Sequence, residues 1–152
     1  MAVTENAHRL RKGRYSEIDR IYSVTVTTHQ RRPVFADWQL GRLLVHELRR
    51  TEQQGLAQSL AWVVMPDHFH WLFQLKKTSL SHLLKQVKAR SAIALNKVSR
   101  REGQLWHKGF YDHAIRREES LRKHARYIIA NPLRAGLVTR IGDYPLWDAI
   151  WL

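Results

Sequence analysis

The sequence carries two histidines, His68 and His70, at the start of a short run with the character of a β-strand. Residues two apart in a strand point to the same face, so the two imidazoles would lie side by side while Phe69 and Trp71 face the other way. Neutral imidazole nitrogens bind divalent cations, and a strand would hold their separation constant. The spacing alone is weak evidence, because nine histidines in 152 residues make such a pair common by chance and a polar strand face would look the same.

Tyr127 and Asn131 form a second candidate pair, four residues apart at the end of a predicted helix. Residues four apart project from one side of a helix, so a phenol and an amide oxygen would lie one turn from each other. This spacing suits a tyrosine nucleophile beside a metal ligand, although a tyrosine with its ring in the core and its hydroxyl at the surface is the commoner arrangement. Pro132 disfavours helical backbone at the residue before it, so we expect the helix to bend or end there and the amide to tip toward the sheet. Tyr111, beside Asp112 and His113, is the rival nucleophile.

Composition restricts both the metal chemistry and the class of protein. The content of 44% hydrophobic and 26% charged residues is typical of a folded soluble protein. Because cysteine is absent from the sequence, a cation would have to be held by His, Asn, Gln, carboxylate or backbone oxygen. The longest apolar run, residues 60–65, is too short to cross a membrane, and the polar N-terminus lacks the hydrophobic region of a signal peptide. We therefore expect a cytosolic protein.

The charge distribution predicts a polyanionic partner. The chain has 26 Lys and Arg against 13 Asp and Glu, a net charge of +13. Residues 76–140 alone hold 16 basic and 4 acidic groups, a net +12. Nucleic acid fits this excess better than a membrane surface, because no segment combines a lysine-rich face with a free and continuous apolar face.

Candidate DNA contacts lie within this basic half. Lys85, Lys88 and Arg90 share one predicted helix and could follow a phosphate backbone, although a basic helix face is more often simply solvated. Trp106 could stack on a base or belong to the core. The other candidates are Lys108, Arg116 and Arg134.

Periodicity predicts the elements that position these residues. Period-two alternation indicates strands at 21–27, 60–65, 69–75 and 109–116, with a turn at Pro66-Asp67 joining the middle two into a hairpin. Helical spacing indicates one helix from Asp37 as N-cap to Gly55, one with a stripe from Leu80 to Val98 after Ser79 or Ser81 as cap, and one at 121–129.

The resulting order, β-α-β-β-α-β-α, predicts an α+β fold with a ferredoxin-like antiparallel sheet covered by helices. We expect a single domain over residues 1–152. Residues 1–14 are polar and basic and are expected to be loose, while the apolar tail at 141–152 is expected to dock on the domain.

Three stretches of the sequence resemble the REP-associated tyrosine transposases, bacterial members of the single-tyrosine HUH superfamily, in which U is a bulky hydrophobic residue. They are MPDHFHWL (65–72), WHKGFYDHAIR (106–116) and ARYIIANPLRAGL (125–137), and the resemblance runs from about Gly13 to the C-terminus. It implies that His68, His70 and Asn131 bind Mg²⁺ or Mn²⁺ and that Tyr127 becomes covalently joined to DNA. It also implies a single-stranded REP-type DNA hairpin as the partner and a nucleoid-associated location in bacterial cytoplasm; monomer and homodimer both stay open.

The function predicted on this basis is metal-dependent cleavage and strand transfer of single-stranded DNA hairpins through a 5′-phosphotyrosine intermediate. Two alternatives stay open. A non-catalytic nucleic-acid-binding protein would bind the hairpin without metal and never link to it. A metal-dependent nuclease that uses water would release two free DNA ends.

Overall fold

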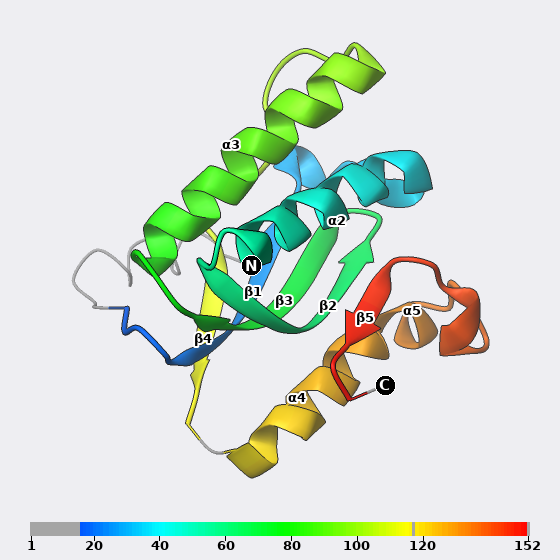
Figure 1. The fold of residues 1–152 in the computed structure, drawn as a ribbon. Helices are drawn as coiled ribbons and strands as arrows, with labels where there is room; N and C mark the ends of the chain where they lie inside the picture. Colours follow the sequence, from blue (N-terminus) through cyan, green and yellow to red (C-terminus); the bar gives the residue numbers. More distant parts are fainter. Residues whose placement is uncertain (1–15, 117, 152) are drawn as a thin grey trace.

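The computed structural model describes residues 16–116 and 118–151 as an α+β fold built on one five-stranded antiparallel sheet (Figure 1). The strands are β1 (Ile21–Thr27), β2 (Ala57–Met65), β3 (His68–Leu75), β4 (Tyr111–Ile115) and β5 (Trp147–Ala149), in the spatial order β4-β1-β3-β2-β5. The first four strands and the helices between them form the predicted ferredoxin-like arrangement, which is thereby confirmed. The expected loose segment 1–14 lies outside the described residues.

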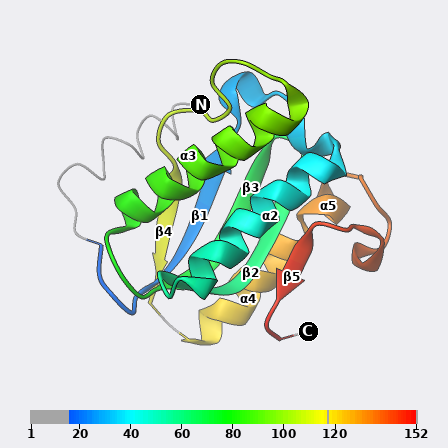
Figure 2. The same ribbon diagram turned by 45° about the horizontal axis from the view of Figure 1, so that its top comes forward.

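Two helices, α2 (Trp38–Gln53) and α3 (Leu80–Ser99), lie side by side over one face of the sheet (Figure 2). The Asp37 carboxylate accepts a hydrogen bond from the Gln39 N–H at 3.0 Å, as the predicted N-cap of α2 should. Of the two candidate caps for α3, Ser79 is the one used: its Oγ accepts from the His82 N–H at 3.1 Å. Side-chain caps therefore set where both helices begin.

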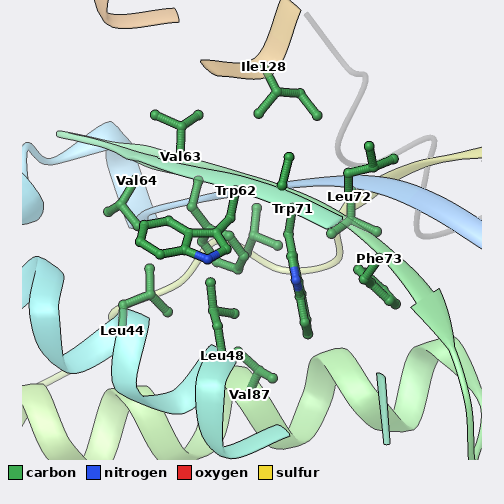
Figure 3. Close-up of a cluster of buried hydrophobic side chains, with 14 of the residues drawn as sticks. Leu44, Leu48, Trp62, Val63, Val64, Trp71, Leu72, Phe73, Val87 and Ile128 are labelled. Atoms are coloured by element: carbon green, nitrogen blue, oxygen red, sulfur yellow. The ribbon is translucent and has the colours of Figure 1, made fainter. Parts of the chain in front are cut away.

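The main core lies between these helices and the sheet. Phe69, Trp71 and Phe73 of β3 are fully buried there, as period-two alternation predicts. Figure 3 shows Trp71 and Phe73 on the face of β3 that turns toward the helices, with Leu44 of α2 and Val87 of α3 on the same side. This burial fixes which way each residue of β3 points, and it leaves His68 and His70 on the opposite face.

The opposite face is covered in part by α4 (Glu118–Ile129) and the short α5 (Asn131–Arg134). The predicted apolar side of α4 is buried through Leu121, Ala125 and Ile128, and Figure 3 shows Ile128 across the sheet from Leu44. The expected break before Pro132 is present, because α4 ends at Ile129 and a new turn begins at Asn131. Proline is tolerated in that first turn, where its missing N–H would have no helical partner.

The C-terminal tail docks as a strand. β5 pairs antiparallel with β2, with Ala149 opposite Ala61, and the Tyr144 hydroxyl donates a hydrogen bond to the Val64 carbonyl. The predicted docking of this tail is thus present, but β5 itself is not predicted from the sequence, because a strand of three residues carries too little alternation to be recognised.

The predicted apolar stripe of α3 is wrong at its C-terminal end. Leu80, Val87 and Leu95 are buried, but Val98 is 60% exposed. The end of α3 projects beyond the sheet (Figure 1), so its last turn has no sheet to pack against. Within residues 16–116 and 118–151, no helix combines the length and apolarity needed to cross a membrane.

Leu44→Ala tests the core between α2 and the sheet. Leu44 is fully buried, and its truncation should lower the free energy of unfolding by about 2–5 kcal/mol through lost burial and a residual cavity. Urea denaturation measures the change. Ile93→Ala, at a position that is 69% exposed on α3, is the control and should stay within about 0.5 kcal/mol of the parent protein. Equal effects of the two substitutions would contradict this description of the core.

Candidate active site

Each of the two imidazoles of β3 is held by a second side chain at Nδ1. His68 Nδ1 lies 2.7 Å from Asp67 Oδ1, and His70 Nδ1 lies 2.8 Å from Thr25 Oγ1 on β1. The two ring centroids are 4.8 Å apart. Because Nδ1 of each ring is engaged, Nε2 is the nitrogen that each ring presents to the site.

Both imidazoles favour their neutral form. Burial lowers the pKa of His68, and hydrogen bonding to Asp67 only partly opposes it. Burial, followed by the charges of His68 and Arg134, lowers the pKa of His70 to about 3. A neutral imidazole keeps a nitrogen lone pair, which is the form that binds a cation.

Asp67 keeps its negative charge beside these rings. Burial acts to raise its pKa, but hydrogen bonds and charges from His68 and Arg31 outweigh this effect and leave the pKa below its usual value. Arg31 Nε donates to Asp67 Oδ2 at 3.0 Å. The turn between β2 and β3 therefore supplies the carboxylate that orients His68.

Asn131 lies beside His70, since a side-chain hydrogen bond between the two residues acts to raise the pKa of that imidazole, as an interaction with the amide oxygen would. Asn131 Nδ2 donates to the Ile128 carbonyl at 2.8 Å. With Nδ2 engaged at the end of α4, the amide oxygen Oδ1 is the atom that faces His70 and that could act as a ligand. The amide is turned toward the sheet, as expected from the helix break before Pro132.

Tyr127 lies on the exposed side of α4, and 66% of its surface is accessible. The Arg134 guanidinium carbon lies 3.8 Å from the centre of the Tyr127 ring, in a cation–π contact. Arg134 Nη2 also donates to the Tyr127 carbonyl at 2.6 Å. The phenol is thus accessible from solvent and accompanied by a permanent positive charge.

A cleft of about 580 Å³ lies between α4 and strands β1, β3 and β4. It is hollow over β1, because Ser23 and Thr25 present small side chains on that face. Its lining comes from three strands and α4: Ser23, Thr25, His70, Tyr111, His113, Lys123, His124, Tyr127 and Ile128. Tyr127 and His70 therefore face one shared space.

The donor set of His68, His70 and Asn131 fits a divalent cation. Two neutral imidazole nitrogens and an amide oxygen suit a borderline or hard cation, and metal-binding histidines usually have a second partner like those at Nδ1 here. No group of three or more His, Asp or Glu side chains within residues 16–116 and 118–151 is placed to hold a metal ion. A cation at this site would therefore need the Asn131 amide as its third protein ligand.

The predicted DNA contacts are spread over the molecule. Lys85, Lys108 and Arg116 are exposed, and Arg90 is half-buried. Arg134 is the one among them that the fold brings to Tyr127 and His70. The others lie on α3, in the loop before β4 and at the end of β4, outside the cleft lining.

Trp106 belongs to the core. Only 5% of its surface is exposed, and its ring lies 5.5 Å from Phe35 and 5.4 Å from Phe69 between centroids. Its indole N–H donates to Ser91 Oγ at 2.9 Å. Of the two interpretations of this tryptophan, burial is the one that the structure favours, because no ring face is left for a base.

Comparison with known proteins identifies the family. The family model described as Transposase IS200 like matches residues 18–131. This chain belongs to the IS200-like transposases. The resemblance to REP-associated tyrosine transposases that the three motifs indicated is confirmed.

Two curated relatives and one solved structure extend this result. The REP-associated tyrosine transposase of Escherichia coli K12 is 28% identical over 106 residues, which cover 68% of this chain and 61% of that protein. A Haemophilus influenzae relative is 29% identical over 99 residues, 58% of this chain and 56% of that protein. A solved REP-associated tyrosine transposase bound to a REP hairpin is 26% identical with a TM-score of 0.76, and the match covers 88% of this chain and 79% of that one. The chain thus spans about three fifths of the length of the curated relatives.

In this member of the IS200-like family, the residues that hold the imidazoles could not be recognised from the two histidines alone. Asp67 stood next to His68 but was interpreted only as a turn residue, although a carboxylate beside a histidine is itself a signal. Thr25 is 45 positions from His70 in the chain. Only the pairing of β1 with β3 brings these two side chains together, so no local pattern could have identified Thr25.

Lys88 forms hydrogen bonds within the protein, whereas Lys85 on the same helix is exposed. Lys88 Nζ donates to the carbonyls of His107 and Gly109 at 2.9 and 3.0 Å. Burial lowers the pKa of Lys88 to about 8. Its ammonium group therefore links α3 to the loop before β4. The same hydrogen bonds direct this group toward the protein and not toward an external phosphate.

Lys88→Met tests this internal role through the pH dependence of stability. Folded Lys88 loses its proton near pH 8, whereas an unfolded lysine does so near about pH 10.4, so the unfolded chain binds more protons between these values. Stability should therefore rise with pH in this window. From about pH 7.5 to about pH 9.5, the unfolding free energy of the parent minus that of Lys88→Met should increase by about 1–2 kcal/mol in urea denaturation. Lys85→Met is the matched control, and a pH-independent difference for Lys88→Met would contradict the internal role.

Proposed function

We propose that this chain is a metal-dependent endonuclease and strand transferase that acts on single-stranded DNA folded into REP-type hairpins. The observation that carries the proposal is that an exposed phenol and one of the three candidate cation ligands line the same cleft. Tyr127 and His70 line this cleft, and Asn131 contacts His70. A nucleophile and cation ligands that share one space can act on the same phosphodiester.

The proposed partner is supported by the relatives and by charge. The solved relative is described as bound to a REP hairpin, and the E. coli relative is named a REP-associated tyrosine transposase. A net charge of +13 fits a polyanion. Nucleic acid in hairpin form is therefore the partner class we assign to this chain.

In the proposed cleavage step, the Tyr127 oxygen attacks phosphorus in line with the bond to the 3′ oxygen. The new bond joins the tyrosine oxygen to phosphorus, the bond from phosphorus to the 3′ oxygen breaks, and the 3′ oxygen takes up a proton as the phenol loses one. His68, His70 and Asn131 would hold Mg²⁺ or Mn²⁺, which when bound neutralises a non-bridging phosphate oxygen. Arg134, which lies over the Tyr127 ring, adds a permanent positive charge beside the phosphate.

Strand transfer follows from the same chemistry in reverse. The phosphotyrosine bond keeps the energy of the phosphodiester that was broken, so a 3′-hydroxyl can attack it without ATP. Attack reforms a bond from phosphorus to a 3′ oxygen and returns the proton to Tyr127. One tyrosine therefore serves for both cleavage and joining.

Tyr127→Phe should abolish cleavage, because it deletes the oxygen that bonds to phosphorus while it keeps the ring and its packing. The measurement uses a 5′-labelled and a 3′-labelled hairpin oligonucleotide with Mg²⁺ or Mn²⁺. Denatured parent protein should carry the strand 3′ of the cut as a 5′-phosphotyrosine, and mass spectrometry of the digested adduct should locate it on Tyr127. Tyr111→Phe is the matched control and should cleave like the parent.

Three results would contradict the proposed role of Tyr127. An adduct on Tyr111 would keep the covalent chemistry but move the nucleophile. Cleavage by Tyr127→Phe, with no adduct in the parent protein, would support a nuclease that uses water. Hairpin binding by the parent with no cleavage under any metal condition would support a binding protein.

His70→Ala should abolish metal-dependent cleavage and leave hairpin binding largely intact, because Lys and Arg contacts to phosphate supply most of the binding free energy. Cleavage is followed on gels, and binding by fluorescence anisotropy at one fixed salt concentration. His82→Ala, at an exposed position at the start of α3, is the matched control. Asn131→Ala should lose less activity than His70→Ala, because water can replace one neutral oxygen ligand. Full cleavage in excess chelator would contradict the role of the cation.

A further inference from the structure

One side of the cleft is lined by ring-bearing side chains that the proposed reaction does not use. Tyr111 and His113 come from β4, and His124 comes from α4. The volume of about 580 Å³ lies within the range of sites that enclose a whole small molecule. The whole cleft can therefore hold more than the phosphate at which Tyr127 acts.

The strand register sets the position of the half of the cleft that Tyr111, His113 and His124 line. Thr25 of β1 is paired with His70 of β3 on one side and with Tyr111 of β4 on the other. Neighbouring strands are about 4.8 Å apart, so Tyr111 starts about 10 Å from His70, across the small side chain of Thr25. Ser23 is likewise paired with His113. Two small hydroxyl residues therefore form a floor between the rings of β4 and the candidate cation site.

The far wall of the cleft is made by a histidine pair that joins β4 to α4. The ring centroids of His113 and His124 are 5.7 Å apart, with their planes inclined by 31°. Tyr111 stands at the open side with 47% of its surface exposed, and Lys123 is the one cation of this half of the lining. The space thus combines flat rings with one positive charge and has no carboxylate among its lining residues.

We propose that this half of the cleft binds one unpaired nucleotide next to the phosphate that Tyr127 attacks. The base stacks on Tyr111 and the histidine pair, and the nucleotide's phosphate faces Lys123. A base offers an apolar ring face and its phosphate a negative charge, which matches this lining. The inference rests on the proposed function for the identity of the attacked phosphate. In this proposal Tyr111 is a stacking residue for the substrate, and its pairing opposite Thr25 places it in the cleft lining.

The test distinguishes the contribution of base stacking to binding from the contribution of phosphate contacts, and it does so without DNA cleavage. All variants are made in a Tyr127→Phe background, and binding is measured by fluorescence anisotropy. The probes are a labelled DNA hairpin with a short single-stranded thymidine flank and the same hairpin with abasic sites in that flank. Tyr111→Ala should weaken binding of the thymidine probe about tenfold or more and leave binding of the abasic probe unchanged. Tyr111→Phe, which keeps the ring, should bind both probes within about twofold of the background protein.

A second variant tests the same nucleotide site while Tyr111 and both histidines stay in place. Ser23→Phe fills the floor of the cleft and should weaken binding of the thymidine probe as Tyr111→Ala does, again with little effect on the abasic probe. Circular dichroism melting checks that each variant is folded. Equal binding by Tyr111→Ala and Tyr111→Phe, or equal losses on the two probes, would overturn the nucleotide site. Because these are binding measurements, their result is independent of whether the parent protein forms a phosphotyrosine adduct.

Discussion

The pairing of β1 with β3 on one side and β4 on the other is the constraint on which the candidate site depends. It places Thr25 between His70 and Tyr111. Burial of Val24 and Val26 under α2 and α3 enforces this register, because a slip of one residue would exchange the faces of β1 and expose both valines. The hydrophobic core on one face of the sheet therefore determines the polar geometry of the other.

The second constraint is the way α4 packs on the sheet. Ala125 and Ile128 are buried, while Tyr127 between them points to solvent, as helical periodicity requires. The break after Ile129 then redirects the chain, and Asn131 reaches His70. The amphipathic helix α4 thus positions the Tyr127 phenol, and the break at its end positions the Asn131 amide.

Positive charge is divided between the surface and the interior. Arg134 lies against Tyr127 and Arg31 against Asp67, so these two guanidinium groups act within the site. Lys88 donates to backbone carbonyls and stabilises the loop that leads into β4. The net charge alone therefore does not distinguish basic residues that form contacts inside the fold from those that are exposed to solvent.

The sequence by itself determined the order of the first four strands and the main helices, the cap at Asp37, and the family, because alternation, helical periodicity and contiguous motifs are local properties of the chain. It left the cap of α3 open between Ser79 and Ser81, and the structure shows that Ser79 is the cap. Spacing made the histidine pair and Tyr127 candidates, and the family resemblance assigned roles to them. Only the tertiary structure decided that Thr25 holds His70, that Trp106 is a core residue and that Val98 is exposed. These outcomes depend on strand register and on where a helix runs past the sheet. Both are set by contacts between distant segments, which leave no periodic signal in either segment alone.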